Sequence, residues 1–206
     1  MGVESLEKWL RRAAGAGFVV FIAVVMQGLA RSARRPKGRS SGPAVQTLGI
    51  LRASYLPMGV VAVGFLYKIW KPLPLRLPGP LRLALSLVGA LLYFPGLALF
   101  LWGRRTMGEM YDLSSGLGVQ LYADHKLVTT GPFALVRHPL YLGGIVAELG
   151  ALLLFRNWAM LLTALNAPAL MTRAQREEVA LADEFGEEWS EYKQRTPMLV
   201  PRVRAG

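Results

Sequence analysis

The chain has no cysteine, only two histidines and few acidic residues. Without cysteine, disulfides, zinc–thiolate sites and a cysteine nucleophile are all excluded. His125 and His138 are too few for a histidine-built metal site of the usual kind. We therefore expect the function to rest neither on thiol chemistry nor on a histidine-built metal site.

The shortage of acidic residues leaves the chain strongly basic. Asp and Glu number 13 against 24 Lys and Arg, a formal net charge of +11. Hydrophobic residues make up 53% and charged residues 18%, below the roughly 25% charged residues of soluble domains. A protein this basic and apolar is suited to anionic lipid head groups. We expect the lipid bilayer as its partner, and no nucleic acid.

Five apolar stretches predict an all-α integral membrane protein. A bilayer-spanning helix needs about 20 mostly apolar residues. Residues 13–30 meet that length and are interpreted as a retained signal anchor, and 48–70 and 81–102 follow. The shorter stretches 140–155 and 158–171 are separated only by Arg156 and Asn157, which predicts a helical hairpin. The fold is expected to have about five transmembrane helices, or four if that hairpin is re-entrant.

The distribution of positive charge predicts the orientation. With five spans, residues 31–47, the segment 103–139 and the C-terminal tail share one side and hold 15 Lys and Arg, against 8 on the other. Cytoplasmic loops carry the excess of Lys and Arg. We therefore expect a multi-pass protein, in a bacterial inner membrane, with a cytoplasmic C-terminus. Residues 1–102 are expected to supply N-terminal transmembrane helices, and 103–206 the functional region.

Three polar clusters in that region could carry chemistry. In HKLVTTGPF, residues 125–133, Gly-Pro predicts a turn after an extended stretch that could offer backbone groups to a flat ligand. In RHPLYLGG, residues 137–144, proline is typical of a first helical turn. The free N–H groups there favour a carboxylate or phosphate, with Arg137 and His138 strengthening the preference. Each cluster also has a plain structural interpretation, as a surface loop or as interfacial anchors.

The third cluster, residues 173–178, follows the last apolar stretch. On a helix Arg173 and Glu177 share a face, whereas Glu178 is expected to point elsewhere; an exposed, salt-bridged helix is the alternative. Two charges within predicted spans, Arg52 and Glu148, are costly and so are candidates for function or pairing. They could pair with each other, or Glu148 could line a lipid-access groove.

The order of these motifs resembles the isoprenylcysteine carboxyl methyltransferase family. HKLVTTGPF, RHPLYLGG, a hairpin, RxxxEE and FGEEWSEYKQRTP follow one another as they do in that family, over roughly residues 103 to 203. An RHPxY motif alone is shared with phospholipid methyltransferases and sterol-reductase-like membrane proteins. The resemblance implies an integral membrane enzyme that uses S-adenosyl-L-methionine, with a cofactor pocket on the cytoplasmic side formed by the methyltransferase region 103–206.

The resemblance also implies roles for individual residues. Arg173 corresponds to an arginine implicated in substrate binding and is the candidate catalytic residue, with Glu148 a further substrate-binding candidate. Phe133 replaces the family's usual tyrosine, so a ring remains for stacking but a hydroxyl is lost. The implied cofactor-binding residues are Gln120, His125, Lys126, Leu127, Val128, Phe133, Arg137, His138, Pro139, Leu140, Tyr141 and Glu177.

Several functions stay open on the sequence. A carboxylate acceptor is already nucleophilic and needs only an orienting cation, which suits Arg173. Methylation of an amine or thiol would need a base, and few are evident. An NADPH-dependent reductase related to the sterol reductases, or a non-catalytic membrane protein, are the other classes. No GxGxxG motif follows a strand, so a soluble Rossmann methyltransferase is not indicated.

Overall fold

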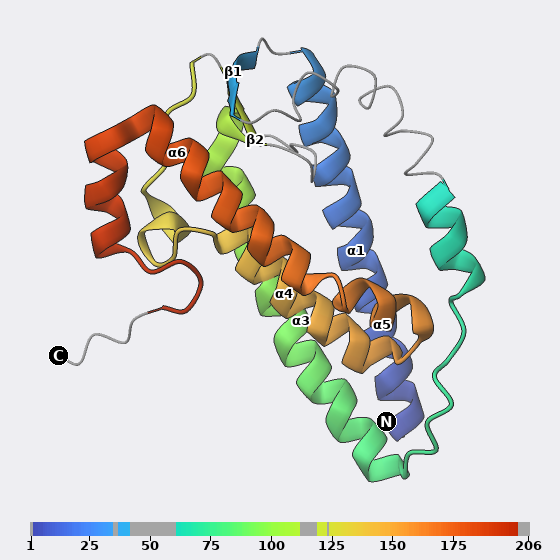
Figure 1. Ribbon diagram of the computed structural model, residues 1–206. Coiled ribbons are helices and arrows are strands. Elements are labelled where there is room, and N and C mark those ends of the chain that lie inside the picture. The colour runs from blue at the N-terminus through green and yellow to red at the C-terminus, as the bar shows by residue number, and fades with distance from the viewer. Residues whose placement is uncertain (1, 35–36, 42–60, 112–118, 123, 202–206) are drawn as a thin grey trace, which may run out of the picture.

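The computed structural model describes residues 2–34, 37–41, 61–111, 119–122 and 124–201, and it is predominantly helical (Figure 1). The predicted helical character is thus confirmed. The described residues also include a short antiparallel sheet of β1 and β2, in which Ser40 is opposite Gln120. Residues 61–68 are helical as well. The elements are, in order, α1 (Val3–Arg34), β1 (Lys37–Ser41), α3 (Gly79–Met107), η2 (Gly108–Met110), β2 (Val119–Tyr122), η3 (Gly131–Ala134), α4 (Pro139–Phe155), α5 (Trp158–Ala164) and α6 (Ala167–Arg195).

Two helices within the described residues are long and apolar enough to cross a membrane. They are Glu4–Gln27 within α1 and Gly79–Met110, and they contain most of the predicted stretch 13–30 and all of 81–102. α4 is a further apolar helix, too short to count as a candidate span, and it begins at Pro139 as predicted. Of the predicted stretch 48–70, the part before residue 61 lies outside the described residues.

The prediction of one helix over residues 158–171 is wrong. α5 ends at Ala164, and α6 begins at Ala167. Pro168 lies in the first turn of α6 and has no N–H with which to continue an α-helix from α5. The tight connection before α5 is confirmed: Arg156 adopts φ 50°, ψ 50°, and the Asn157 side chain accepts a hydrogen bond of 2.8 Å from the Met160 N–H.

Close packing of α3 against α4 fixes where α4 lies. A Cβ added at Gly96 would fall 2.5 Å from the Ala147 nitrogen, and one at Gly143 would fall 2.7 Å from the Gly96 oxygen. Such distances are below any tolerable contact, so glycine alone lets the two backbones approach this closely. α1 packs on the same pair, and its Ala14 carbonyl accepts a 2.8 Å hydrogen bond from the Tyr93 hydroxyl.

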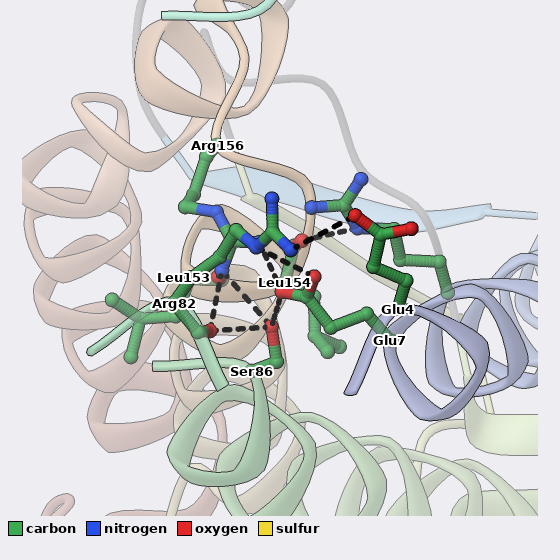
Figure 2. Close-up of polar contacts among 8 residues, drawn as sticks. Glu4, Glu7, Arg82, Ser86, Leu153, Leu154 and Arg156 are labelled. Atoms are coloured by element: carbon green, nitrogen blue, oxygen red, sulfur yellow. Dashed lines mark hydrogen bonds and ion pairs between the residues drawn. The ribbon is translucent and has the colours of Figure 1, made fainter. Parts of the chain in front are cut away.

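At the end where α1 and α3 begin and α4 ends lies a buried polar cluster (Figure 2). We call Glu7, Arg82, Ser86 and Arg156 the closed cluster. Arg156 Nη2 lies 2.8 Å from Glu7 Oε1, and Arg156 Nη1 lies 3.0 Å from Ser86 Oγ. Arg82 Nε lies 2.9 Å from the other Glu7 oxygen. These contacts join the starts of α1 and α3 to the end of α4, all of which were predicted to lie on the side with fewer Lys and Arg.

At the opposite end lie the described parts of the segments that were predicted to share the side richer in Lys and Arg. β1 comes from residues 31–47 and pairs with β2 from the segment 103–139. Near the C-terminus, Gly186 adopts φ 50°, ψ −112° within α6, a conformation that penalises residues with a Cβ. Figure 1 shows the last part of α6 turning sharply away from the direction of the main helix.

Candidate functional site

A cavity of about 440 Å³ lies away from the closed cluster and is lined by side chains of α1, α3, α4, α5, α6 and the loop before α4. Most of its lining is apolar, including Phe21, Phe100, Leu149 and Leu170. Polar groups gather around the start of α4 and the facing part of α6. The volume is in the usual range for small-molecule and cofactor sites, roughly 300–1,000 Å³.

Arg173, Tyr141 and Glu177 form a hydrogen-bonded chain in the cavity wall. Arg173 Nε donates to the Tyr141 hydroxyl at 2.8 Å, and Tyr141 hydrogen-bonds Glu177. All three line the cavity. The predicted common face of Arg173 and Glu177 is therefore present, with a tyrosine from α4 between them.

Glu178 lies beside this chain and contacts both polar residues that precede α4. Its Oε1 accepts from Arg137 Nε at 2.8 Å and lies 3.2 Å from His138 Nε2. The other His138 nitrogen, Nδ1, is 3.7 Å from Glu177. The expectation that Glu178 points elsewhere is thus wrong: neighbouring positions on α6 both reach His138 because its ring lies between the two carboxylates. We call Arg137, His138, Glu177 and Glu178 the cavity cluster.

These contacts hold Glu178 ionised. Burial by itself would raise the pKa of Glu178, but hydrogen bonds from His138 and Arg137, together with their charges, outweigh burial and lower it to about 2. The carboxylate is then a fixed negative charge at neutral pH. It anchors the two side chains at the start of α4.

Arg137 also binds residues 193–197, the segment around the end of α6, beside the cavity. Its backbone N–H donates to the Pro197 oxygen at 2.9 Å, and that of His138 to the Met198 oxygen at 3.1 Å. The Arg137 guanidinium donates to the backbone oxygens of Lys193 and Thr196 and lies over the Trp189 ring. Arg137 therefore holds the C-terminal segment in place; its direct contact with a cofactor stays a prediction.

The loop before α4 supplies the adjoining wall. His125, Leu127, Val128 and Phe133 line the cavity, and Gly131 makes the turn with φ 59°. Among the other predicted cofactor residues, Arg137, His138, Leu140, Tyr141 and Glu177 also line it.

Two predicted residues lie away from the cavity lining, and the side chain of a third is not described. Lys126 and Pro139 are not among the lining residues: the Lys126 N–H donates to the Met110 sulfur at 3.3 Å, and Pro139 is buried where α4 begins. Gln120 belongs to β2, and its side chain lies outside what the structure describes.

Glu148 lines the cavity farther along α4, where it accepts a hydrogen bond from the Thr163 hydroxyl. Its predicted partner Arg52 lies outside the described residues. The position of Glu148 in the wall agrees with a role in holding a ligand, which stays a prediction.

Trp189 and Tyr192 are lining residues that sequence reasoning missed. They were recognised only as part of the FGEEWSEYKQRTP motif. Both are buried, and the Tyr192 hydroxyl donates to the Phe133 oxygen at 2.7 Å. The three-residue spacing of Trp189 and Tyr192 predicts that they share one face of a helix. Their position at the cavity, however, depends on the turn at Gly186.

The described residues thus form an apolar helical bundle with two candidate membrane spans and a cavity between its helices. Residues 89–183 match the model of the isoprenylcysteine carboxyl methyltransferase (ICMT) family. The match over residues 89–183 agrees with the family resemblance that the order of motifs indicates. The matched region includes α4, Arg173, Glu177 and Glu178.

Individual relatives carry different names. The chain is 33% identical over 82 residues to a protein-S-isoprenylcysteine O-methyltransferase of Schizosaccharomyces pombe, covering 39% of this chain and 35% of the relative. It is 29% identical over 164 residues to methanethiol S-methyltransferase 1 of Bradyrhizobium diazoefficiens, covering 76% and 56%. It is 33% identical over 129 residues to the cobalt-zinc-cadmium resistance protein CzcN of Cupriavidus metallidurans, covering 60% and 51%. The matches thus span about a third to just over half of each relative's length.

Proposed function

We propose that the protein is an integral membrane methyltransferase that uses S-adenosyl-L-methionine and transfers the methyl group to a lipidic or amphipathic acceptor, favouring a carboxylate. The cavity end of the bundle would face the cytoplasm. The observation that carries this proposal is the Arg173–Tyr141–Glu177 chain, which puts a cation, a hydroxyl and a carboxylate side by side in a mostly apolar cavity. The match of residues 89–183 to the ICMT family model supports it.

The residues present fit this cofactor. Its ammonium and sulfonium groups suit carboxylate and aromatic neighbours, which Glu177, Tyr141 and Phe133 supply. Its carboxylate suits the start of α4, where backbone N–H groups are free of helical partners. The loop 125–133 offers backbone and apolar contacts to a purine. Residues proposed to hold the cofactor are therefore those of this loop, His138, Leu140, Tyr141 and Glu177, with Arg137 fixing the segment around them.

When bound, the cofactor supplies an electrophilic methyl group on a positively charged sulfur. The remaining work is positioning, which alone can contribute about 7–11 kcal/mol to a reaction between well-oriented groups. Arg173 is placed to orient an anionic acceptor, since its cationic side chain lines the cavity and its Nε donates to Tyr141 in the cavity wall. The apolar lining excludes water, which strengthens the attraction between Arg173 and a carboxylate.

A thiol acceptor is the second candidate. The similarity to a protein named methanethiol S-methyltransferase 1 covers 76% of this chain, more than the similarity to the isoprenylcysteine enzyme. A thiol reacts as its thiolate and would need to lose a proton first. His138 and Glu177 are the titratable groups nearest to the Arg173–Tyr141 pair that could accept it.

Calorimetric binding of S-adenosylmethionine and S-adenosylhomocysteine to the purified protein in detergent tests the proposal. We expect binding by the parent, at least tenfold weaker binding by His138→Ala and Glu177→Gln, and unchanged binding by Glu184→Gln, an exposed position on the same helix. Equal binding by all four would refute the assigned site. A folded parent that binds neither compound but binds NADPH would favour the reductase class.

A further inference from the structure

Glu148 is the only charged residue of α4, whose sequence is otherwise apolar apart from Tyr141. A carboxylate in such a helix is costly unless it has a partner. Within the part of the chain that the structure describes, Thr163 is the only residue that hydrogen-bonds it. The cost of placing Glu148 there is therefore poorly compensated by the described contacts.

Thr163 cannot satisfy the carboxylate fully. A hydroxyl has a single proton, and an ionised carboxylate has about four acceptor positions. The Thr163 oxygen also lies 3.0 Å from the Ala159 oxygen and 3.2 Å from the Met160 oxygen, two further acceptors that compete for that proton. Most of the accepting capacity of Glu148 thus remains for another group.

The cavity is where that other group can come from. Glu148 and Thr163 both line it, together with Ile145 and Leu149. Glu148 lies seven positions after Tyr141, which on an α-helix is the same face and about 10 Å along the axis. The cavity therefore has a cation, Arg173, near one end of α4's exposed face and a carboxylate about two turns farther on, with apolar residues between.

We propose that Glu148 and Thr163 recognise a cationic amine within the apolar part of the methyl acceptor. The acceptor would present its reacting anionic group to Arg173 and its ammonium group to Glu148. This inference rests on the proposed function, because it assigns the acceptor to the cavity. It narrows the acceptor from a plain hydrocarbon-tailed acid to a hydrocarbon-tailed acid that carries an amine.

Two matched probes test this inference without knowledge of the natural acceptor. One is dodecanoic acid; the other is the same acid with a secondary ammonium in place of the ninth carbon, about as far from the carboxylate as Glu148 is from Tyr141. Binding of each is measured by calorimetry to the protein in nanodiscs, with empty nanodiscs as the blank, and with S-adenosylhomocysteine present and absent.

We expect the parent to bind the amine-containing acid about tenfold more tightly than dodecanoic acid. Glu148→Gln should remove the preference, and Arg173→Gln should weaken both acids alike. Glu184→Gln should leave the preference intact. If Glu148→Gln fails to fold by circular dichroism, Thr163→Val tests the same pair and should reduce the preference.

Three outcomes would overturn the inference: binding of neither acid, no preference in the parent, or a preference that survives Glu148→Gln. If the parent showed no preference for the amine-containing acid but Arg52→Gln did, Glu148 would be paired with Arg52 and not with the acceptor. Failure of the proposed function shows itself separately, as absence of S-adenosylhomocysteine binding whatever the acids do.

Discussion

Two clusters of buried charge lie at opposite ends of the bundle and use the same kinds of side chain. In the closed cluster, Glu7 is bound by Arg82, Ser86 and Arg156, and none of these residues lines the cavity. In the cavity cluster, Glu178 is bound by Arg137 and His138, and the histidine, the arginine and Glu177 all line the cavity. Buried charge is therefore not in itself a sign of a binding site; what distinguishes the second cluster is the cavity beside it.

The comparison assigns different physical roles to the two clusters. The closed cluster ties together the beginnings of α1 and α3 and the end of α4, so its loss should cost stability. The cavity cluster orders the start of α4 and the C-terminal segment around the cavity, so its loss should cost binding first.

The largest expected effect is on stability, from Glu7→Gln. Removing the carboxylate leaves the buried guanidinium of Arg156 without its counter-charge, and breaking a buried pair in this way costs about 3–5 kcal/mol. Denaturant unfolding in detergent should show that loss. The matched control is Glu4→Gln, since Glu4 is largely exposed and its contact with Arg82 is long, at 3.7 Å. The stability of the Glu4→Gln variant should be near that of the parent.

Binding of S-adenosylhomocysteine should distinguish Glu7→Gln from a variant in the cavity cluster. Glu7→Gln, measured at a temperature where it remains folded, should bind S-adenosylhomocysteine as the parent does. Weakened binding in a folded Glu7→Gln protein would contradict the division of roles.

Glu178→Gln should have the opposite profile. Hydrogen bonds to charged groups contribute about 1.5–3 kcal/mol each, and Glu178 holds two side chains that border the cavity. We expect S-adenosylhomocysteine to bind about 10- to 100-fold more weakly, with a smaller stability loss than that of Glu7→Gln. A stability loss as large as that of Glu7→Gln, with binding unchanged, would make Glu178 a purely structural residue.

Each feature can be predicted from the sequence only where it depends on residues that are close together in the chain. The start of α4 at Pro139, the turn at Arg156 and the common face of Arg173 and Glu177 depend on local chemistry, so the sequence predicts them. The break after α5 also had a local signal, Pro168, which the apolar run around it concealed.

The closed cluster had no such signal. Glu7 and Arg156 are 149 positions apart, and Glu7 and Ser86 are 79 apart, so only the packing of α1, α3 and α4 brings them together. Glu178 was missed for a related reason: helical spacing relates it to Arg173 and Glu177 but not to Arg137, which approaches from another element. The motif order named many of the residues that line the cavity, because the family resemblance, unlike spacing, reflects a tertiary arrangement.

Acid should weaken the cavity cluster in a defined window. The pKa of Glu178 is lowered from 4.5 to about 2 in the folded protein, so its contribution to stability is complete above about pH 4.5 and is lost as the pH falls toward 2. The stability difference between the parent and Glu178→Gln should therefore be constant at neutral pH and shrink through that window. Unfolding midpoints of both proteins across pH 2–7 would measure it; a difference that grows in acid would contradict the assigned contacts.

The smallest effect comes from a matched pair of buried tyrosines. Tyr93 donates to the Ala14 oxygen at 2.8 Å in the core between α1 and α3, and Tyr192 donates to the Phe133 oxygen at 2.7 Å in the cavity wall. Replacing either by phenylalanine removes one hydrogen bond and leaves a carbonyl oxygen behind, so each should lose about 1 kcal/mol of stability.

Only the cavity tyrosine should affect ligand binding. Phe133 belongs to the loop proposed to contact the purine, and the Tyr192 hydrogen bond fixes its backbone, so Tyr192→Phe should weaken S-adenosylhomocysteine binding severalfold while Tyr93→Phe leaves it unchanged. Because the two variants remove the same group at nearly the same stability cost, a difference in binding cannot come from general destabilisation. Equal binding by both would mean that the loop is held by its other contacts, such as the turn at Gly131, and would limit the binding role of the C-terminal segment to Arg137 and Trp189.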